Sequence, residues 1–207
     1  MNYTILELPR RAKFQILALG AQSKSSFCFV KKNIAYVSKP GGDLGGLENL
    51  KIFEKDIKVL KRRLKIEPAI IACDLHPEYT STKLAFELAE RNSVVQIQHH
   101  EAHLASCIAD NNIKGKVIGI AFDGTGFGRD GNIWGGEFFI GGLKGFKRAA
   151  HLEYIPMPGG EAAVREPWRM ALSYLYKVYK KQGLNWFKVQ PRTNRLKPTV
   201  RGMGSNG

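Results

Sequence analysis

Two stretches of this sequence contain the same succession of short apolar segments separated by loops. The first stretch begins with the run at residues 16–19 and the second with the run at residues 117–122, and each run has the length and apolar character of a buried strand. After each run come a loop of small residues, two further strand-like segments and a helix-like segment. This repeated order predicts an α/β fold with two related lobes, each built on its own sheet.

The expected elements follow from this reading. In the first stretch, strands are expected at residues 16–19, 26–30, 34–37, 69–73 and 94–97, and helices at 47–64, 81–91 and 99–110. In the second, strands are expected at 117–122, 133–140 and 146–155, with a helix opening at Pro167. A duplicated start of this kind is how the two lobes of actin-like ATPases begin, with the first hairpin turn of each lobe against the nucleotide phosphates. The expected class is therefore an actin-like ATPase (ribonuclease H-like) α/β fold, with one complete lobe plus the start of the second.

The predicted organisation has four parts. Residues 1–13 form an N-terminal polar lead, 14–114 the first lobe, 115–183 the beginning of a truncated second lobe, and 184–207 a basic tail that is expected to be disordered. Residues 177–207 contain eight Lys or Arg and no acid, which is more than half of the net charge of +14. Nucleic acid is therefore an unfavoured partner, since its only support lies in this tail.

Composition narrows the cellular setting. No apolar run approaches the roughly 20 residues that span a bilayer, so no membrane segment is expected. The three cysteines lie far apart among apolar residues, with no zinc-finger spacing. This predicts reduced, buried thiols and a cytoplasmic protein.

A histidine cluster provides the first chemical signal. His99 and His103 are four residues apart on an expected helix, so their side chains share one face and can bind a single metal ion. Asp123, at the end of another strand, is the candidate third ligand, and zinc or iron is the expected divalent ion. The zincin pattern His-Glu-x-x-His is absent here, which excludes a metalloprotease of that type.

Two loops of small residues provide the second signal. Gly124, Thr125 and Gly126 follow the strand that ends at Asp123, and a loop with Gly20 and Lys24 follows the other first strand. Bare backbone N–H groups and one lysine charge make a phosphate or nucleotide clamp plausible, although neither loop has the Walker A pattern.

A third segment contains His76, directly after another strand. Its imidazole is a candidate acid or base near neutral pH. An equally good interpretation is structural: Asp74 caps a turn that Pro77 fixes.

Taken together, five ordered motifs resemble those of the HypF carbamoyltransferases. They are Asp-Leu-His-Pro-Glu-Tyr-Thr-Ser-Thr (74–82), Gln-His-His-Glu-Ala-His-Leu-Ala-Ser (98–106), Ala-Phe-Asp-Gly-Thr-Gly-Phe-Gly (121–128), Trp-Gly-Gly-Glu-Phe (134–138) and Arg-Glu-Pro-Trp-Arg-Met-Ala (165–171). The resemblance runs from about Ile16 to Tyr179. It corresponds to the first part of the family's C-terminal domain, which is similar to the tRNA threonylcarbamoyl-transferase ATPase.

The resemblance implies a reaction. HypF-type enzymes make carbamoyl-adenylate from carbamoyl phosphate and ATP, and they transfer the carbamoyl group to the C-terminal cysteine of a HypE-type partner. That group becomes the cyanide ligand of [NiFe]-hydrogenase. By position, His99, His103 and Asp123 match the metal ligands of the family, and the two loops match its nucleotide contacts. His76 and His100 are the expected catalytic histidines.

The resemblance also leaves alternatives open. The acylphosphatase-like, zinc-finger and YrdC-like domains of the family do not appear, nor does the rest of the second lobe, so a truncated chain is expected. The missing remainder is a possible partner as a separate chain. A carbamoyl-transfer lobe that is incomplete alone is the leading hypothesis, and a catalytically inactive fragment that binds maturation partners is the alternative. A second lobe built only in part also predicts an uncovered sheet face and self-association.

Overall fold

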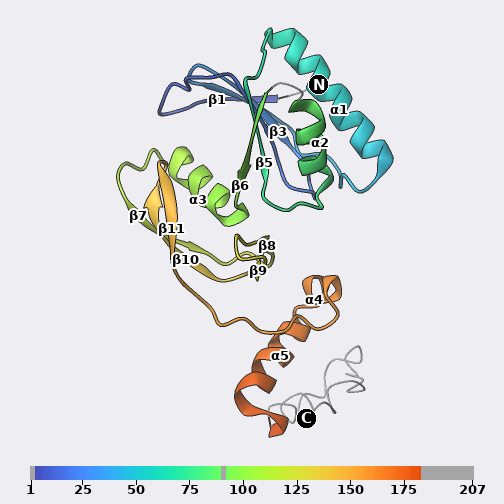
Figure 1. Ribbon diagram of the computed structural model, residues 1–207, viewed down its shortest axis with the longest axis vertical. Coiled ribbons are helices and arrows are strands. Elements are labelled where there is room, and N and C mark those ends of the chain that lie inside the picture. Colours follow the sequence, from blue (N-terminus) through green and yellow to red (C-terminus); the bar gives the residue numbers. More distant parts are fainter. Residues whose placement is uncertain (1–2, 90–91, 183–207) are drawn as a thin grey trace. The chain divides into compact units, whose positions relative to one another are not determined.

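The computed structural model describes residues 3–89 and 92–182, and Figure 1 shows their elements. The tail predicted for residues 184–207 lies outside the described residues. Contacts divide the chain into two compact units, residues 1–152 and 153–207. The boundary between lobes predicted near residue 114 falls inside the first of these units. The elements of the first unit are β1 (Tyr3–Glu7), β2 (Ile16–Leu19), β3 (Phe27–Lys31), β4 (Ile34–Ser38), α1 (Leu47–Leu64), β5 (Ile70–Asp74), α2 (Thr80–Ala89), β6 (Ser93–Ile97), α3 (His99–Asp110), β7 (Val117–Ala121), β8 (Gly126–Phe127), β9 (Ile133–Trp134), β10 (Glu137–Gly142) and β11 (Gly145–His151).

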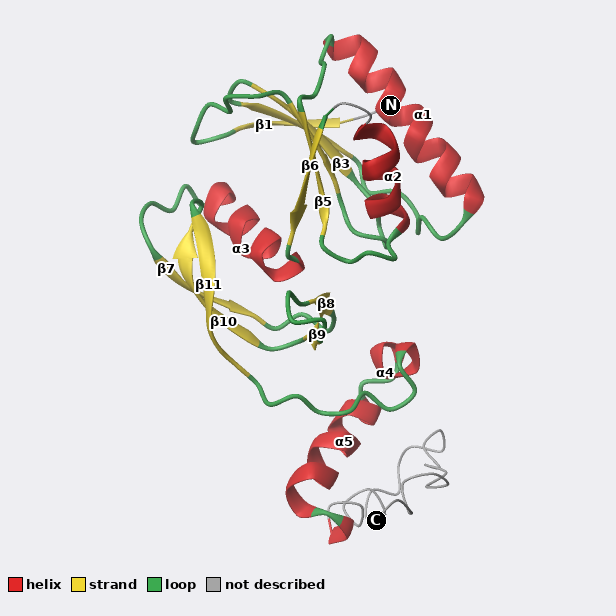
Figure 2. Cartoon of the chain, in the orientation of Figure 1, coloured by secondary structure: helices red, strands yellow, loops and turns green. Residues whose placement is uncertain are grey.

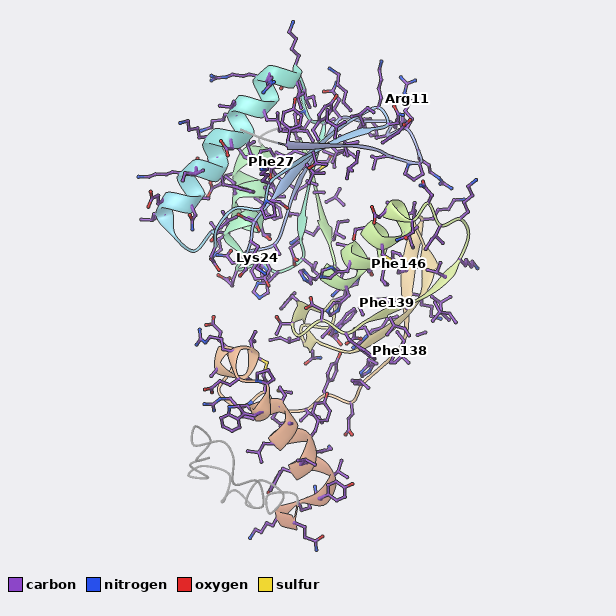
Figure 3. All side chains as sticks on the ribbon, turned by 180° about the vertical axis from the view of Figure 1, so that it is seen from behind. Arg11, Lys24, Phe27, Phe138, Phe139 and Phe146 are labelled. Carbon is purple, nitrogen blue, oxygen red and sulfur yellow. The ribbon has the colours of Figure 1, made fainter. Side chains whose placement is uncertain are left out.

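A six-stranded sheet organises the first part of this unit, in the order β1-β4-β3-β2-β5-β6. β2, β5 and β6 run parallel, whereas β1, β4, β3 and β2 pair antiparallel. Because strand side chains alternate between faces, Phe27 and Phe29 point to the same side, where helices α1 and α2 cover the sheet (Figure 2). Phe27, which is labelled in Figure 3, meets Phe53 of α1 edge to face, with 5.4 Å between ring centroids. Each fully buried side chain of this kind contributes about 1.5–3 kcal/mol to stability.

A second, three-stranded antiparallel sheet has the order β11-β10-β7. Helix α3 packs on it through Leu104, against a small core of Ala121, Trp134 and Phe139. Gly119 permits this close packing, because a Cβ atom at that position would lie 2.5 Å from Leu104 Cδ1. The sequence of β7 thus fixes how near α3 approaches the strand that leads to Asp123.

The strands and helices predicted for residues 16–110 agree with the structure to within a few residues at their ends. Two differences stand out. The polar lead contains strand β1, which pairs with β4 at the edge of the sheet; its side chains are mostly exposed, so it lacks the apolar alternation of a buried strand. The single strand predicted for residues 133–140 is two strands, β9 and β10, interrupted at Gly135 and Gly136. Gly136 packs so tightly on Leu152 that a Cβ atom there would lie 2.6 Å from its side chain.

The second unit contains α4 (Glu161–Arg165) and α5 (Trp168–Tyr179). Inside it, the Ser173 hydroxyl donates to the Pro156 carbonyl at 2.7 Å, and Lys177 pairs with Glu153 at 2.8 Å. These bonds hold α5 to the segment that precedes α4. Among the helices of the described residues, none has the length and apolar character that crossing a membrane requires.

Candidate metal centre

The histidine helix starts where a parallel strand ends. Gln98 caps α3: its side chain is fully buried and accepts a hydrogen bond from the Glu101 backbone N–H at 3.0 Å. Since β6 ends at Ile97, the first turn of α3 lies at the carboxyl edge of the large sheet. Open α/β sheets bind their ligands at this edge.

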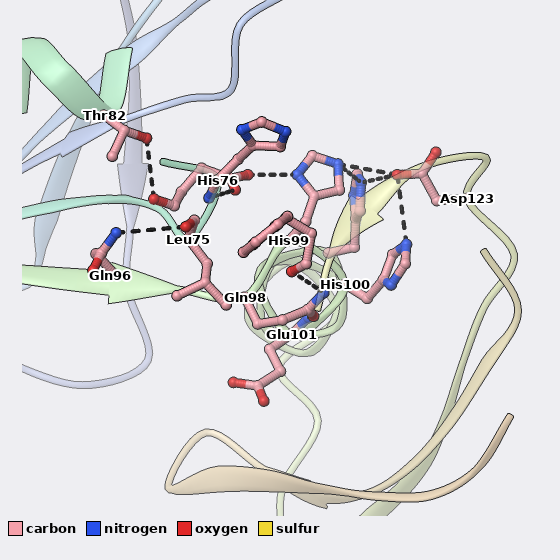
Figure 4. A network of polar contacts seen from close by, with 12 residues as sticks. Leu75, His76, Thr82, Gln96, Gln98, His99, His100, Glu101 and Asp123 are labelled. Atoms are coloured by element: carbon pink, nitrogen blue, oxygen red, sulfur yellow. Dashed lines mark hydrogen bonds and ion pairs between the residues drawn. The ribbon is translucent and has the colours of Figure 1, made fainter. Parts of the chain in front are cut away.

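The three predicted ligands converge. His99 Nε2 lies 3.2 Å from His103 Nε2, and Asp123 Oδ2 lies 3.0 Å from His99 Nε2 and 3.4 Å from His103 Nε2 (Figure 4). Tetrahedral zinc with bonds of 2.0–2.1 Å requires ligand atoms about 3.3 Å apart, so these separations fit one ion. Three protein ligands also leave a fourth position open, as in catalytic rather than structural zinc sites. The described residues therefore contain a candidate metal centre of the type predicted.

Asp74 completes this arrangement from the neighbouring strand. It is 8% exposed, and its Oδ2 lies 2.7 Å from His99 Nδ1. A carboxylate only accepts hydrogen bonds, so His99 must donate from Nδ1, which leaves the lone pair of Nε2 facing Asp123. The hydrogen bond to Asp74 is also the main reason why the pKa of His99 is raised.

From the sequence, Asp74 is expected only to cap a turn, and the structure adds this second role. Both roles exist, because its Oδ1 accepts the His76 backbone N–H at 2.8 Å. The parallel register aligns Asp74 with Ile97 and so places the carboxylate next to the start of the histidine helix, a pairing that no local sequence pattern indicates.

The Asp123 carboxylate is itself oriented. Its Oδ1 accepts the Gly124 backbone N–H at 2.8 Å, so Oδ2 is left to face the imidazoles. Asp123 is 40% exposed and His103 57%, whereas His99 is 19% exposed. The centre is therefore open to solvent on the His103 side.

His100 lies behind the centre rather than in it. Its side chain is fully buried, 3.8 Å from Asp123 Oδ2, and neither ring nitrogen has a hydrogen-bond partner among the described residues. Burial is the main cause of its lowered pKa, so the ring is neutral at pH 7. The ring packs under Gly126, where a Cβ atom would lie 2.8 Å from it. In this arrangement His100 supports the loop, and a direct catalytic role stays a prediction.

His76 lies on the other side of Asp74. Its ring stacks on Tyr79 with centroids 4.1 Å apart, and its Nδ1 accepts the Glu78 backbone N–H at 3.2 Å. Because Nδ1 accepts with its lone pair, the hydrogen of the neutral ring lies on Nε2, which is thus the donor of this side chain. Within residues 3–89 and 92–182, no hydrogen bond or ion pair joins the His76 ring to the three candidate ligands.

The first of the two predicted phosphate loops already binds a carboxylate of the chain itself. In the first loop, the Gln22 amide and the Ser23 hydroxyl bind the Asp43 carboxylate, at 3.2 and 3.0 Å. Gly20 makes the turn possible, because a Cβ atom there would lie 2.8 Å from the Ser26 carbonyl oxygen. Lys24 is exposed, and in the described part of the chain no hydrogen bond or ion pair links it to Thr125 in the second loop. Direct contacts therefore do not join the two loops of the predicted clamp, which are the loop of Gly20 and Lys24 and the loop of Gly124, Thr125 and Gly126.

The cysteines are not all buried as expected. Cys73 is buried, Cys28 is half-buried and Cys107 is exposed on α3. Cys107 lies one turn after His103 in α3, on a face of this helix that is exposed to solvent.

Fold and centre together define a class of protein: an α/β domain of the actin-like ATPase, Kae1-like type. Solved structures agree. A full-length HypF in its phosphate- and nucleotide-bound form superposes with a TM-score of 0.80 at 38% identity, covering 91% of this chain and 25% of that one. HypF from T. kodakarensis superposes with a TM-score of 0.74 at 39% identity, covering 84% and 23%.

The chain belongs to the HypF family. Residues 11–110 match the HypF Kae1-like domain, and residues 119–205 match the second subdomain of the carbamoyltransferase Kae1-like domain. Carbamoyltransferase HypF2 of Cupriavidus necator is 42% identical over 163 residues, which are 78% of this chain and 20% of that protein. The probable carbamoyltransferase HypF of Methanocaldococcus jannaschii is 38% identical over 178 residues, 84% of this chain and 23% of that protein.

The matches cover more of this chain than the five sequence motifs do, but they cover only a small part of each relative. The second subdomain match reaches residue 205, well past the Tyr179 at which the sequence motifs end. The chain spans only about a fifth of the length of the relatives named here.

Proposed function

We propose that this chain provides the carbamoyl-transfer centre of a HypF-type enzyme. In this proposal, His99, His103 and Asp123 hold a divalent zinc or iron ion, and the substrates are carbamoyl-adenylate and the C-terminal cysteine of a HypE-type protein. The observation that carries it is the convergence of three ligand atoms within 4.8 Å of one another, in a chain whose relatives are carbamoyltransferases.

The transfer itself has a simple balance. The cysteine sulfur forms a bond to the carbamoyl carbon, the bond from that carbon to the phosphate oxygen breaks, and AMP leaves with the electron pair. A bound ion would supply positive charge next to the phosphate and the developing oxyanion.

The residues of the chain have separate tasks in this reaction. Asp74 keeps the proton on His99 Nδ1, and the Gly124 N–H keeps Asp123 turned toward the imidazoles. His76 is the candidate acid that donates to the substrate through its Nε2–H, and the thiol proton passes to water. Lys24 and the backbone of the Gly124–Gly126 loop are the candidate phosphate contacts, with Gly20 shaping the first loop.

Metal content tests the centre. The purified chain is loaded with zinc or with iron, desalted and measured by plasma mass spectrometry, beside a His99→Ala, His103→Ala double variant. The proposal expects about one ion per chain in the wild type and almost none in the variant. A His151→Ala variant is the matched control, because it removes an imidazole on β11 that is not one of the three candidate ligands. Equal, negligible metal in all three proteins contradicts the centre.

A transfer assay then separates the two functional hypotheses. The chain is given carbamoyl-adenylate and a HypE-type protein, and thiocarbamate formation on the terminal cysteine is followed by mass spectrometry. Transfer that depends on His99 supports the enzyme. Metal binding without transfer favours the alternative, a fragment that docks onto maturation partners, since this chain spans only a fifth of the length of its relatives.

A further inference from the structure

A cavity of about 480 Å³ lies away from the candidate metal centre. Three separate segments of the first unit line it: the connection after β1, the connection between α3 and β7, and the turn between β10 and β11 (Figure 1). Its volume is within the range of roughly 300–1,000 Å³ that small-molecule sites occupy.

The charge of its lining is one-sided. Arg10, Lys114, Lys116 and Lys144 all line the cavity, and no acidic residue does. These four cations are exposed and make no ion pair with any described residue. Four uncompensated positive charges around one concave surface raise the local concentration of anions.

Four glycines line the cavity, so its wall includes main chain that no side chain covers. Gly115, Gly141, Gly142 and Gly145 line it, and a Cβ atom at Gly142 would lie 2.7 Å from the Gly115 carbonyl oxygen. Gly115 and Gly145 have φ of 91° and 136°, where side chains are disfavoured. The glycines thus bring two loops together and leave their main chain accessible to a ligand.

The rest of the lining is apolar. Pro9, Ile113 and Leu143 contribute to it, and the last two remain 40% and 43% exposed. A ligand that fits both parts combines several negative charges with a flat or apolar body.

This cavity is distinct from the metal centre. It adjoins the C-terminal end of α3 and the start of β7, whereas His99 lies at the first residue of α3 and Asp123 follows the end of β7. At 1.5 Å per residue, the end of α3 at Asp110 lies roughly 17 Å along the helix from His99 and roughly 10 Å from His103.

We propose that this cavity binds a small polyphosphate of the nucleoside di- or triphosphate class. The lysines and Arg10 bind the phosphates, and the apolar wall contacts the nucleoside. This site is independent of the proposed carbamoyl transfer.

Calorimetric titration of the full chain with ATP and with inorganic tripolyphosphate tests it. A chelator is present, and the His99→Ala, His103→Ala background is used, so that the metal centre does not contribute. The cavity variant is Lys114→Gln, Lys144→Gln. Its matched control is Lys51→Gln, Lys55→Gln, which removes the same charge from the exposed face of α1.

The proposal expects both probes to bind, ATP more tightly, and the cavity variant to lose roughly tenfold or more in affinity, because charged hydrogen bonds are removed. The control variant should stay within about twofold, since its lysines only add to a distant field. Equal losses in both variants, or no binding of either probe, overturn the site. Equal affinity for ATP and tripolyphosphate overturns the nucleoside part.

Discussion

Replacing Asp74 with asparagine tests whether the candidate centre depends on its neighbouring strand. The change keeps the shape of the side chain and an oxygen for the His76 N–H, but it removes the negative charge 2.7 Å from His99 Nδ1. Loss of the carboxylate partner of a ligating histidine costs about 10–100-fold in metal affinity, which is about 1.4–2.7 kcal/mol. Because Asp74 is only 8% exposed, solvent cannot replace it fully.

The assay is competition for zinc against a chromophoric chelator. It is run at about pH 8, where an ordinary histidine is neutral. Because Asp74 raises the pKa of His99, its removal lessens competition from protons, so a weaker affinity in the variant reports the lost orientation and basicity of the ligand. Asp110→Asn at the exposed end of α3 is the control and should bind zinc as the wild type does. Wild-type affinity in Asp74→Asn would refute the reasoning that Asp74 orients His99.

Three further predictions concern packing, thiols and surface. Gly126→Ala should destabilise the chain by about 1–3 kcal/mol in urea unfolding, because the new Cβ meets a buried histidine ring at 2.8 Å; Gly124→Ala, with open space around it, should stay within about 0.5 kcal/mol. At about pH 8, iodoacetamide should label exposed Cys107 before Cys73, whose pKa burial raises to about 11, as peptide mass mapping can check. Light scattering should show self-association that Ile118→Ser reduces, because that side chain is 77% exposed on an apolar sheet face; a wild-type monomer contradicts this.

The sequence predicted the three ligands because their positions depend on short-range geometry. A four-residue spacing on a helix fixes His99 and His103, and the end of an apolar run fixes Asp123. The role of Asp74 depends instead on which strand lies beside β6, and this is a property of the sheet rather than of any local pattern. Edge strand β1 was missed for a related reason: it is defined by pairing with β4 and not by burial.

Contacts made in the fold, rather than local sequence, also distinguish the loop that follows β2 from the loop that follows β7. The second loop leaves Asp123 Oδ2 facing two imidazoles, so a cation needs no rearrangement to bind there. The first loop holds the carboxylate of Asp43, whose pKa is lowered chiefly by the Gly45 N–H, so the group is ionised at neutral pH. A phosphate approaching this loop meets that negative charge and must displace it from Ser23. Repetition of the topology therefore does not repeat the chemistry: the second loop already has a geometry that suits a cation, whereas a phosphate at the first loop would need a positive charge, such as that of Lys24, to offset Asp43.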